Sequence, residues 1–359
     1  MKKLDLFIIK KFLLTFLFMI GVFVVIAVVF DVSENIDDFL KSEASFWEVV
    51  LKYYVNFCFY FGNLLSAFIV FLSVIWFTSK MAQQTELIAM LSGGIPYRRI
   101  IRPYMLLAGI IVAVSLILAH WIVPIANQTK LEFELKYIKK HLTVSESNLH
   151  REVAPGVLVY FHRVNANTKS GSQLSVEQWE NNRLKSKITA AGATYHPESD
   201  RWTIERATIR NLNSDGKEVV KYHATLDTIL PMKIEDFAMR VEEMNALTTP
   251  DLLEFMKELA LNGSGRIVEF QIELHTRTAN AFSIFILTLI GVAIASRKVR
   301  GGTGVHLFLA VIIGFTFIFL SKITAVAALK IGLPVVLAVW FPNMVFGIFG
   351  FLLYRKAQK

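Results

Sequence analysis

Cysteine and charge are both scarce in this chain of 359 residues. The single cysteine, Cys58, excludes an intramolecular disulfide, so each domain must be held together by its own core. Charged residues make up only 19% of the sequence against 54% hydrophobic residues, and the mean hydropathy is +0.49. This balance excludes an ordinary soluble enzyme and is typical of an integral membrane protein.

Motifs for nucleotide, ion and metal chemistry are also missing from the sequence. A phosphate-binding loop would end in Gly-Lys-Ser/Thr, and the nearest candidate, at residues 301–304, lacks the lysine. Asp and Glu are absent from the long apolar runs, which disfavours an ion-coupled transporter. The eight histidines show no close pair of the His-x-x-x-His kind. We therefore expect no ATP hydrolysis by the chain itself, no metal and no cofactor.

An acidic segment and two histidines are the remaining candidates for the site of a membrane enzyme. The acidic segment, residues 31–38, follows the first apolar run, and a solvated loop explains it without any catalytic role. His120 and His306 stand near the ends of apolar runs, where we expect interfacial residues. A membrane enzyme is thus the weakest of the functional hypotheses.

Six apolar runs are long enough to cross a hydrocarbon core of ~30 Å as helices that rise ~1.5 Å per residue. They cover residues 12–30, 53–78, 104–128, 278–296, 303–321 and 331–354. The first run is too long and too uniformly apolar for a cleaved signal peptide. Three runs precede a polar stretch and three follow it, so the sequence predicts six transmembrane helices and one inserted domain.

Lysine and arginine gather on one side of these spans. They cluster before the first span, after the second, after the fourth and behind the sixth, whereas the short loops of the other side carry Lys41, Lys52 and Lys330. The positive-inside rule then predicts that both termini are cytoplasmic and that the insert lies outside. The net charge of +9 is therefore a topology signal and gives no reason to expect nucleic-acid binding.

The insert, residues 129–277, has the composition of a soluble domain, and its pattern predicts mostly β structure. Apolar residues recur at every second position from Val220 to Leu226 and again at Leu230, as in a half-buried strand. Further strands are expected at residues 156–164, 183–195 and 201–211. The parity of the apolar residues slips in the last of these, which predicts a bulge or bend near Glu205.

Three features of the insert bear on its architecture. The run at residues 157–161 is apolar on both faces, which fits either a central strand of a two-sheet sandwich or a strand whose second face lines a channel for an apolar ligand. A helical continuation of the third span, down to His141, is expected to open the insert. Thr249-Pro250 predicts the start of a linker helix, residues 249–262, with Thr249 as its cap.

The loop after the second span, residues 85–96, is the most informative stretch for function. Its pattern predicts a short helix with Leu87, Met90 and Leu91 on one face and Glu86 beside them, ended by two glycines. Such a helix fits the groove of a partner protein. The alternative is a helix that lies on the lipid surface, but those helices usually carry more Lys and Arg.

The sequence resembles the LptF/LptG permeases of the lipopolysaccharide exporter. Three spans, an extracytoplasmic β domain and three further spans carry the resemblance, together with the motif Glu-Leu-x-x-Met-x-x-x-Gly-Ile-Pro that begins at Glu86 and is followed by Arg98, Arg99 and Pro103. The resemblance covers essentially the whole chain, including Arg277 at the entry to the fourth span. Its most specific part is the Glu86 loop.

The resemblance implies a helical membrane protein with an inserted periplasmic all-β domain of the jellyroll type. Two LptF/LptG-type subunits would enclose a lipid-sized cavity between the first span of one and the fifth span of the other. A cytoplasmic ABC ATPase dimer, LptB-like, would bind the ATP. Periplasmic bridge proteins, LptC/LptA-like, would receive the lipopolysaccharide. The chain would be an inner-membrane, non-catalytic transport subunit.

Several residues acquire expected roles from the resemblance. Glu86 would form a salt bridge to an arginine of the ATPase, with Leu87, Met90 and Leu91 on the same coupling helix. Lys41 and Lys322 stand at a suitable depth for the anionic head group, although snorkelling to the interface explains them equally well. Val159 and Phe161 are the candidates for lipid contacts in the β domain. These eight side chains are the ones to locate in the structure.

The expected domains are the transmembrane residues 1–128, the β domain at 129–277 and the transmembrane residues 278–359. One hypothesis of another class stays open. A protein coupled to an ABC ATPase could signal mechanically across the membrane and move no lipid.

Overall fold

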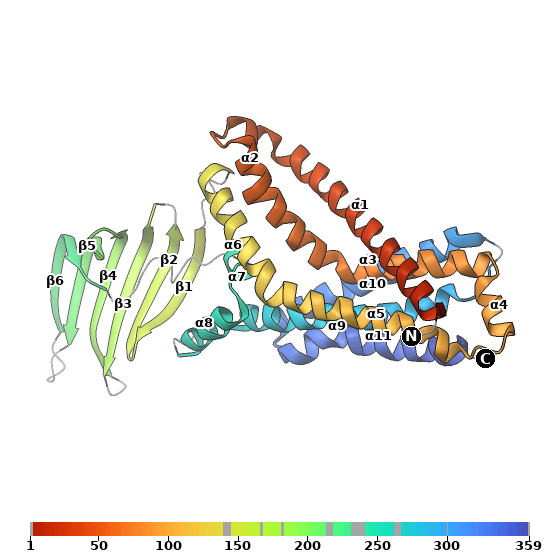
Figure 1. Ribbon diagram of the computed structural model, residues 1–359. Helices are drawn as coiled ribbons and strands as arrows, with labels where there is room; N and C mark the ends of the chain where they lie inside the picture. Colours follow the sequence, from red (N-terminus) through yellow and green to blue (C-terminus); the bar gives the residue numbers. More distant parts are fainter. Residues whose placement is uncertain are drawn as a thin grey trace. The chain divides into compact units, whose positions relative to one another are not determined.

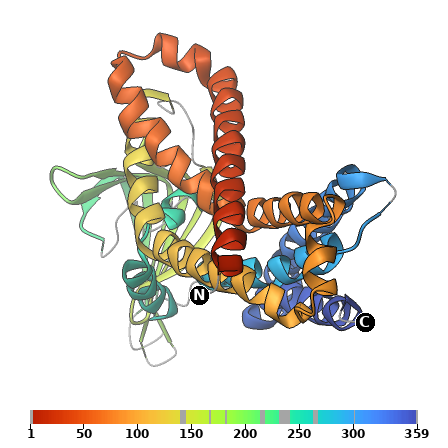
Figure 2. The same ribbon diagram turned by 45° about the vertical axis from the view of Figure 1, so that its right-hand side comes forward.

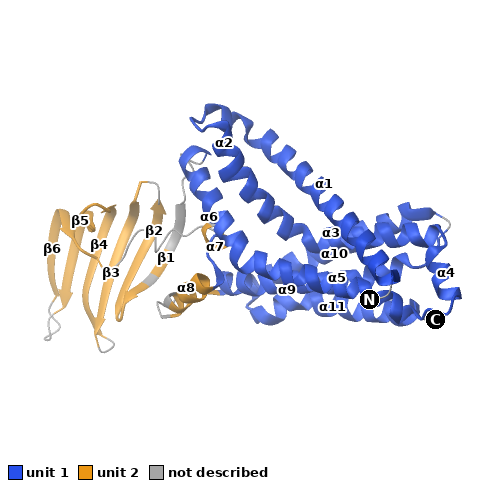
Figure 3. Ribbon diagram, viewed as in Figure 1, with its two compact units in different colours: residues 1–138, 246–249, 268–359 blue, residues 139–245, 250–267 orange. Residues whose placement is uncertain are grey.

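The computed structural model describes residues 3–138, 145–165, 168–180, 183–212, 218–230, 241–261, 267–299 and 301–357. The chain divides into two compact units, which Figure 3 colours separately. Unit 1 comprises residues 1–138, 246–249 and 268–359. Unit 2 comprises residues 139–245 and 250–267. The helices that can cross a membrane belong to unit 1 and the strands to unit 2.

Six helical segments among the described residues are long and apolar enough to span a membrane, which confirms the predicted number of spans. The first span is α1 (Lys3–Lys41). The second is a continuous helical segment made of α2 (Phe46–Glu48), η1 (Val49–Tyr54) and α3 (Val55–Gln83). The third is another continuous segment, made of α5 (Tyr97–Ile117), η2 (Leu118–Ile122), α6 (Val123–Phe133) and η3 (Glu134–Ile138). The others are α9 (Ile267–Ala295), α10 (Gly302–Ile331) and α11 (Val335–Ala357). The η segments are π-helical turns within the second and third spans.

Both chain ends and the short helix α4 (Glu86–Ser92) lie at the same end of the helical bundle, and α2 lies at the opposite end (Figure 1). α1 and α3 form a long hairpin with α2 at the turn, which the turned view in Figure 2 shows from a second side. Every residue from Ile69 to Ile75 on α3 is buried, as expected for a helix that is apolar all round and central in a bundle. α1 and α10 instead leave most of their apolar surface uncovered.

Two predictions about helix ends are wrong. Residues 31–38 do not form a solvated loop, because α1 continues as one helix to Lys41 and the Tyr53 hydroxyl donates to Asp31 Oδ1 at 3.1 Å. The sixth span does not begin at residue 331. Gly332 adopts φ 74°, a conformation open to glycine, and this ends α10 after Ile331. The predicted continuation of the third span is confirmed as far as Ile138, and His141 lies outside the described residues.

Unit 2 contains one six-stranded antiparallel sheet in which each strand pairs with the next along the chain. The strands are β1 (Ser145–Ala154), β2 (Val157–Asn165), β3 (Ser170–Glu180), β4 (Arg183–His196), β5 (Arg201–Leu212) and β6 (Glu218–Thr228). The four predicted strands correspond to β2, β4, β5 and β6. The sequence pattern did not predict β1, which has few apolar residues. It also did not predict β3, on which the buried apolar side chains of the described strand are Leu174 and Val176.

Of the two interpretations of residues 157–161, the two-sheet sandwich is wrong for the described strands, which follow a single meander. β2 alternates as an ordinary strand with one buried face, since Val159 and Phe161 are buried while Leu158 is exposed. The predicted bend in β5 is confirmed. Arg206, next to Glu205, adopts φ 52°, and the pairing with β4 and β6 keeps its register across it. β6 lies at the edge of the sheet, and its apolar face is barely covered.

Two short helices follow the sheet in sequence. They are α7 (Val241–Asn245) and α8 (Thr249–Leu261). α8 begins where Thr249-Pro250 predicted a linker helix, and residue 262 of that prediction lies outside the described residues. Leu252 and Leu259 are buried on α8, in agreement with the apolar stripe of its sequence.

The packing of Phe161 gives a test of the sheet. A Cβ atom at Gly171 on β3 would lie 2.4 Å from the Phe161 ring, whereas a Cβ at Gly192 on β4 would meet nothing closer than 3.4 Å. We expect Gly171→Ala to lower the stability of unit 2 by about 1–3 kcal/mol, since overpacking a core forces side chains out of place. Limited proteolysis of the purified chain at increasing urea would measure the shift. Gly192→Ala is the matched control, and equal effects of the two variants would contradict the packing.

Candidate functional site

The helix α4 is set by special backbone conformations at its two ends. Thr85, which precedes it, has φ 61°, so the chain turns sharply after α3. Gly93 caps the helix, and Gly94 has φ 78°, which lets the amide of Ile95 return to the carbonyl of Met90 at 3.2 Å. Pro96 then precedes α5, as the sequence predicted. The predicted short helix is confirmed, with defined ends.

The apolar face of α4 is directed toward its own bundle. Leu87 is completely buried and Met90 packs partly buried against the same cluster, which includes Ile8 and Tyr97. Leu91, by contrast, is 39% exposed, and Ile88, which sequence reasoning did not single out, is 41% exposed. Leu87 therefore anchors α4, and the uncovered apolar surface of this helix comes from Ile88 and Leu91. Their i, i+3 spacing was the signal available in the sequence.

Two ion pairs join the region of α4 to the start of α1. Lys11 Nζ lies 3.5 Å from Glu86 Oε2, with both side chains partly exposed. The guanidinium of Arg99, on α5, donates to both carboxylate oxygens of Asp5 at 2.6 and 2.7 Å. The second pair is bidentate and mostly buried, so it fixes the two helices in register. The Glu86 carboxylate is the more accessible of the two acids.

The same end of the bundle is also tied to the last three spans. The hydroxyls of Tyr97 on α5 and Ser296 after α9 are 3.1 Å apart. Arg297 donates to the main-chain carbonyl of Lys356 on α11 at 2.7 Å. His306 on α10 shares a 2.9 Å hydrogen bond with Ser79 of α3. A displacement of the helix ends around α4 would therefore reach both halves of the bundle.

Neither histidine side chain is exposed. His306 is buried against α3, and His120 is held between two hydroxyls, those of Thr249 at 2.7 Å from Nδ1 and Thr278 at 3.3 Å from Nε2. That both histidines lie at the membrane interface stays a prediction, because burial and hydrogen bonds do not fix their depth in a bilayer. His120 has a protein partner at each ring nitrogen, and His306 has one at Nδ1. Both histidines act as polar contacts between spans.

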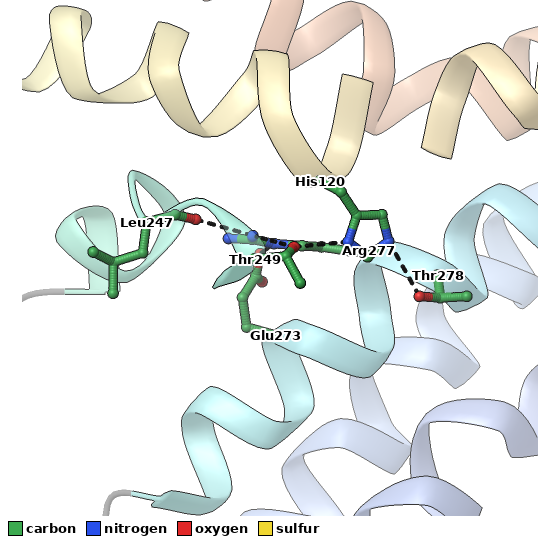
Figure 4. A network of polar contacts seen from close by, with 6 residues as sticks. All are labelled: His120, Leu247, Thr249, Glu273, Arg277 and Thr278. Carbon is green, nitrogen blue, oxygen red and sulfur yellow. Dashed lines mark hydrogen bonds and ion pairs between the residues drawn. The ribbon is translucent and has the colours of Figure 1, made fainter. Parts of the chain in front are cut away.

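Arg277 is the centre of a polar network that Figure 4 shows in detail. Its Nε donates to Glu273 at 2.8 Å, one turn earlier on α9, and its Nη1 donates to the carbonyl of Leu247 at 3.0 Å. The same nitrogen lies 3.4 Å from the hydroxyl of Thr249, which also bonds His120. This buried cation thereby joins α9, the η2 turn of the third span and residues 246–249 within unit 1. The Thr249 hydroxyl, predicted as a simple cap, is part of this network.

A second charged cluster lies at the α2 end of the bundle. Lys130 Nζ is 3.0 Å from Glu134 Oε1 and lies 5.5–5.9 Å from the ring centres of Tyr53, Phe57 and Tyr60. An ammonium over several aromatic faces is stabilised by the ring quadrupoles. Sequence reasoning missed this cluster, although the i, i+4 spacing of Lys130 and Glu134 was a visible signal. The Lys130 cluster holds the C-terminal end of the third span against η1 and α3.

The two candidate head-group lysines are both accessible. Lys41 is the last residue of α1, and Lys322 lies on α10 about 14 Å from its end at ~1.5 Å per residue. Within the described residues neither forms an ion pair. Phe319 and Ile323, which are close to Lys322 in sequence on the same helix, have exposed apolar side chains. Contact with an anionic head group and snorkelling both remain compatible with this placement.

Val159 and Phe161 lie in the core of unit 2. The Phe161 ring stacks on Trp202 with their centres 5.8 Å apart, and both side chains are completely buried. The alternate residues of β2, Leu158 and Tyr160, line a groove of about 530 Å³, and Val159 also contributes to its lining. Direct lipid contact thus needs the sheet to open at Phe161, whereas Leu158 and Tyr160 are reached without any change.

The far wall of this groove is charged. Lys187 on β4 lies 2.7 Å from Glu177 on β3, and this hydrogen bond lowers the pKa of the Glu177 carboxyl below its usual value. The pair is therefore ionised at neutral pH. The groove combines an apolar strip with one compensated ion pair, which suits an amphipathic ligand.

The Arg277 network predicts a strong effect of one substitution. Arg277→Gln leaves Glu273 without its buried partner, and breaking such a pair costs about 3–5 kcal/mol. We expect a lower melting temperature of the purified protein and faster proteolysis at residues 246–249. Thr249→Val keeps the side-chain volume and removes the weaker contacts, so its loss is expected to be smaller. A melting temperature unchanged by Arg277→Gln would contradict the role of the network.

Comparison with known proteins identifies the architecture. A search of curated proteins gave no match. The protein-family comparison matches residues 6–356, nearly the whole chain, to the family described as lipopolysaccharide export system permease LptF/LptG. The six spans and the antiparallel β unit placed in sequence between the third and fourth spans agree with the arrangement expected from the resemblance. The chain therefore belongs to the LptF/LptG family of lipopolysaccharide export permeases, whose members are non-catalytic transport subunits.

Proposed function

We propose that this protein is the permease subunit that extracts lipopolysaccharide from the inner membrane and passes it to a periplasmic bridge, driven by a separate ABC ATPase. The observation that carries the proposal is the family match over residues 6–356. The lack of a phosphate-binding loop in the sequence fits a subunit that depends on another protein for ATP hydrolysis. A second subunit of the same family would complete the lipid cavity.

The proposed contact with the ATPase is the exposed side of α4. Glu86 supplies an accessible carboxylate, and Ile88 and Leu91 supply the apolar surface beside it. An interface residue of this kind works best on a rigid support, and Leu87 provides that support by its burial in the bundle. The two ion pairs to α1 give the motion of the ATPase a route into the spans.

The proposed lipid path follows the two least covered spans. α1 and α10 expose apolar side chains on much of their surface, and these include Phe18 and Phe30 on α1 and Phe308, Phe315 and Phe319 on α10. Such surfaces must be covered by lipid or by a second subunit in the membrane. Lys41 and Lys322 would contact the phosphate groups of the lipid, and the groove beside Leu158 would take part of it in the β unit.

The role of α4 is tested by reversing one charge. We expect Glu86→Lys to abolish ATPase co-purification or stimulated ATP hydrolysis, because the variant places a cation opposite the proposed arginine of the ATPase. Membrane insertion should be unchanged. Full growth of cells that depend on this variant would refute the assignment.

The contact between Glu86 and Lys11 requires a matched control for that experiment. Lys11→Ala removes the internal ion pair and leaves Glu86 in place. We expect this variant to keep the ATPase, since an exposed pair contributes little to stability, of order 1 kcal/mol or less. If Lys11→Ala fails in the same way as Glu86→Lys, the internal pair and not the ATPase contact explains the defect.

The orientation is tested with cysteines in a Cys58→Ala background. A membrane-impermeant maleimide added to spheroplasts should label Ser199→Cys, in the exposed turn before β5, and should leave Ser92→Cys, at the end of α4, unlabelled until the membrane is opened. Lysed cells provide the control for reactivity, because both cysteines must then react. Labelling of Ser92→Cys in intact spheroplasts would place α4 on the wrong side for any ATPase.

Mechanical signalling without lipid transport is the alternative that co-purification separates. Under the proposal, a tagged copy brings both an ATPase and lipopolysaccharide. Recovery of the ATPase with no lipopolysaccharide would favour the signalling protein. Recovery of neither would leave a membrane enzyme as the remaining hypothesis.

A further inference from the structure

Exposed arginines stand beside an aromatic contact that joins α5 to α11. The rings of Tyr97 on α5 and Tyr354 on α11 stack with their centres 6.1 Å apart. Arg98 and Arg355 follow these two tyrosines in the chain, and both are exposed. Arg102, one turn further along α5, is exposed as well. These three residues, Arg98, Arg102 and Arg355, are called the arginine cluster below. The proposed coupling helix and lipid path use none of them.

The arginine cluster lacks carboxylates that could neutralise it. Asp5 and Glu86 are the acidic residues that unit 1 has at this end of the bundle, where both chain ends also lie (Figure 1). The other acidic residues of unit 1 lie at the opposite ends of their spans, in residues 31–48, 132–134 and 269–273. Asp5 is bound by Arg99, and Glu86 lies beside Lys11. Within the described residues, no member of the arginine cluster forms an ion pair.

The depth of the cluster follows from the apolar runs that end beside it. The third run begins at Tyr104, two residues after Arg102, and the sixth run ends at Tyr354, immediately before Arg355. The fourth run ends at Ser296, which shares a 3.1 Å hydrogen bond with the first residue of α5. Three spans therefore leave the hydrocarbon at one level. Arginines at that level reach the phosphate layer of the adjoining leaflet.

The cluster continues into uncovered apolar surface. Leu106, one turn beyond Arg102 on α5, is half exposed, and so is Phe351, one turn before Arg355 on α11. Residues four apart lie on one face of a helix, so these arginines stand above exposed apolar side chains. An ATPase that approaches α4 from the water cannot cover Leu106, which lies inside the apolar run. The second subunit is assigned to α1 and α10, so this face is left to the bilayer.

We propose that the arginine cluster binds the phosphate of an anionic bilayer phospholipid, whose acyl chains lie along the exposed apolar residues of α5 and α11. Guanidinium groups bind phosphate oxygens in a bidentate manner, and basic residues at the ends of spans attract anionic head groups. The bound phosphate would relieve the repulsion among the three arginines. It would also connect α5, from the first three spans, to α11, from the last three.

Two phospholipids with the same acyl chains test the head-group contact. The purified full-length chain, without an ATPase, is titrated in detergent with dioleoyl phosphatidylglycerol or dioleoyl phosphatidylethanolamine, and bound lipid is counted by native mass spectrometry. We expect the wild type to bind the anionic lipid about tenfold more tightly. A cation near the membrane surface contributes roughly fivefold to such binding, so Arg355→Gln should weaken it about fivefold and the double variant Arg98→Gln/Arg102→Gln more strongly.

The double variant Lys3→Gln/Lys10→Gln is the matched control. It removes two exposed cations of α1 from the same end of the bundle, and within the described residues neither lysine forms an ion pair. We expect its affinity for phosphatidylglycerol to stay within about twofold of the wild type, because an exposed cation away from the cluster adds only diffuse attraction.

Equal losses in the two double variants would show diffuse attraction and refute the site. Equal binding of both phospholipids by the wild type, or an unchanged affinity in Arg98→Gln/Arg102→Gln, would refute it too. If that double variant fails to fold, as judged by its melting temperature, Arg355→Gln decides the question. Because no ATPase is present, this site can fail while the proposed transport function stands, and the reverse also holds.

Discussion

The cost of placing charge and unpaired polar groups in hydrocarbon is the constraint on which the helical unit depends. Its buried ions are compensated in pairs, such as Asp5 with Arg99 and Arg277 with Glu273. Each pair joins different parts of the chain or fixes one helix turn, so the same contacts that neutralise charge also set how the spans meet. The middle of α3 is held without an ion pair, because its buried residues are mostly apolar and are surrounded by other helices.

This constraint also explains where the bundle can transmit movement. The ion pairs concentrate at the two ends, around α4 and around the Arg277 network, while the middle is held by apolar packing and a few hydrogen bonds, such as that of Asn343 to the Ala279 carbonyl. Apolar packing tolerates small sliding better than a bidentate ion pair does. The helix ends are therefore the places where the relative positions of the spans are specified, and the middle follows them.

The sequence predicted the number of spans and their approximate positions, because long runs without charge can satisfy their backbone only as helices in a membrane. It failed at residues 31–38, where Tyr53, distant in sequence, provides a partner for Asp31 and the helix continues. It left the partner of Leu87 open, and the role of this residue in ATPase coupling stays a prediction. Its helical position was predicted, but a periodic pattern cannot say whether an apolar face meets its own bundle or another protein.

The β unit shows the same limit in another form. The apolar residues of β2 on both faces suggested two sheets, yet Val159 and Phe161 enter the core while Leu158 and Tyr160 line a groove. The family resemblance rests on the Glu86 motif and the order of elements, and the family match confirms it. The contacts of Arg277, Thr249 and His120 could not be predicted, because they bring together residues far apart in the chain.

The uninterrupted length of α1 has a mechanical consequence. Its 39 residues form a rod of ~58 Å, nearly twice the thickness of the hydrocarbon core, so a tilt of only ~5° about one end carries the other end through ~5 Å. The Asp5 end of this rod is clamped to α5, while its apolar surface beyond Phe16 is largely uncovered. α1 is thus a long lever, in which a small tilt at the Asp5 end becomes, at the far end beside Tyr53, a displacement comparable to the width of an acyl chain.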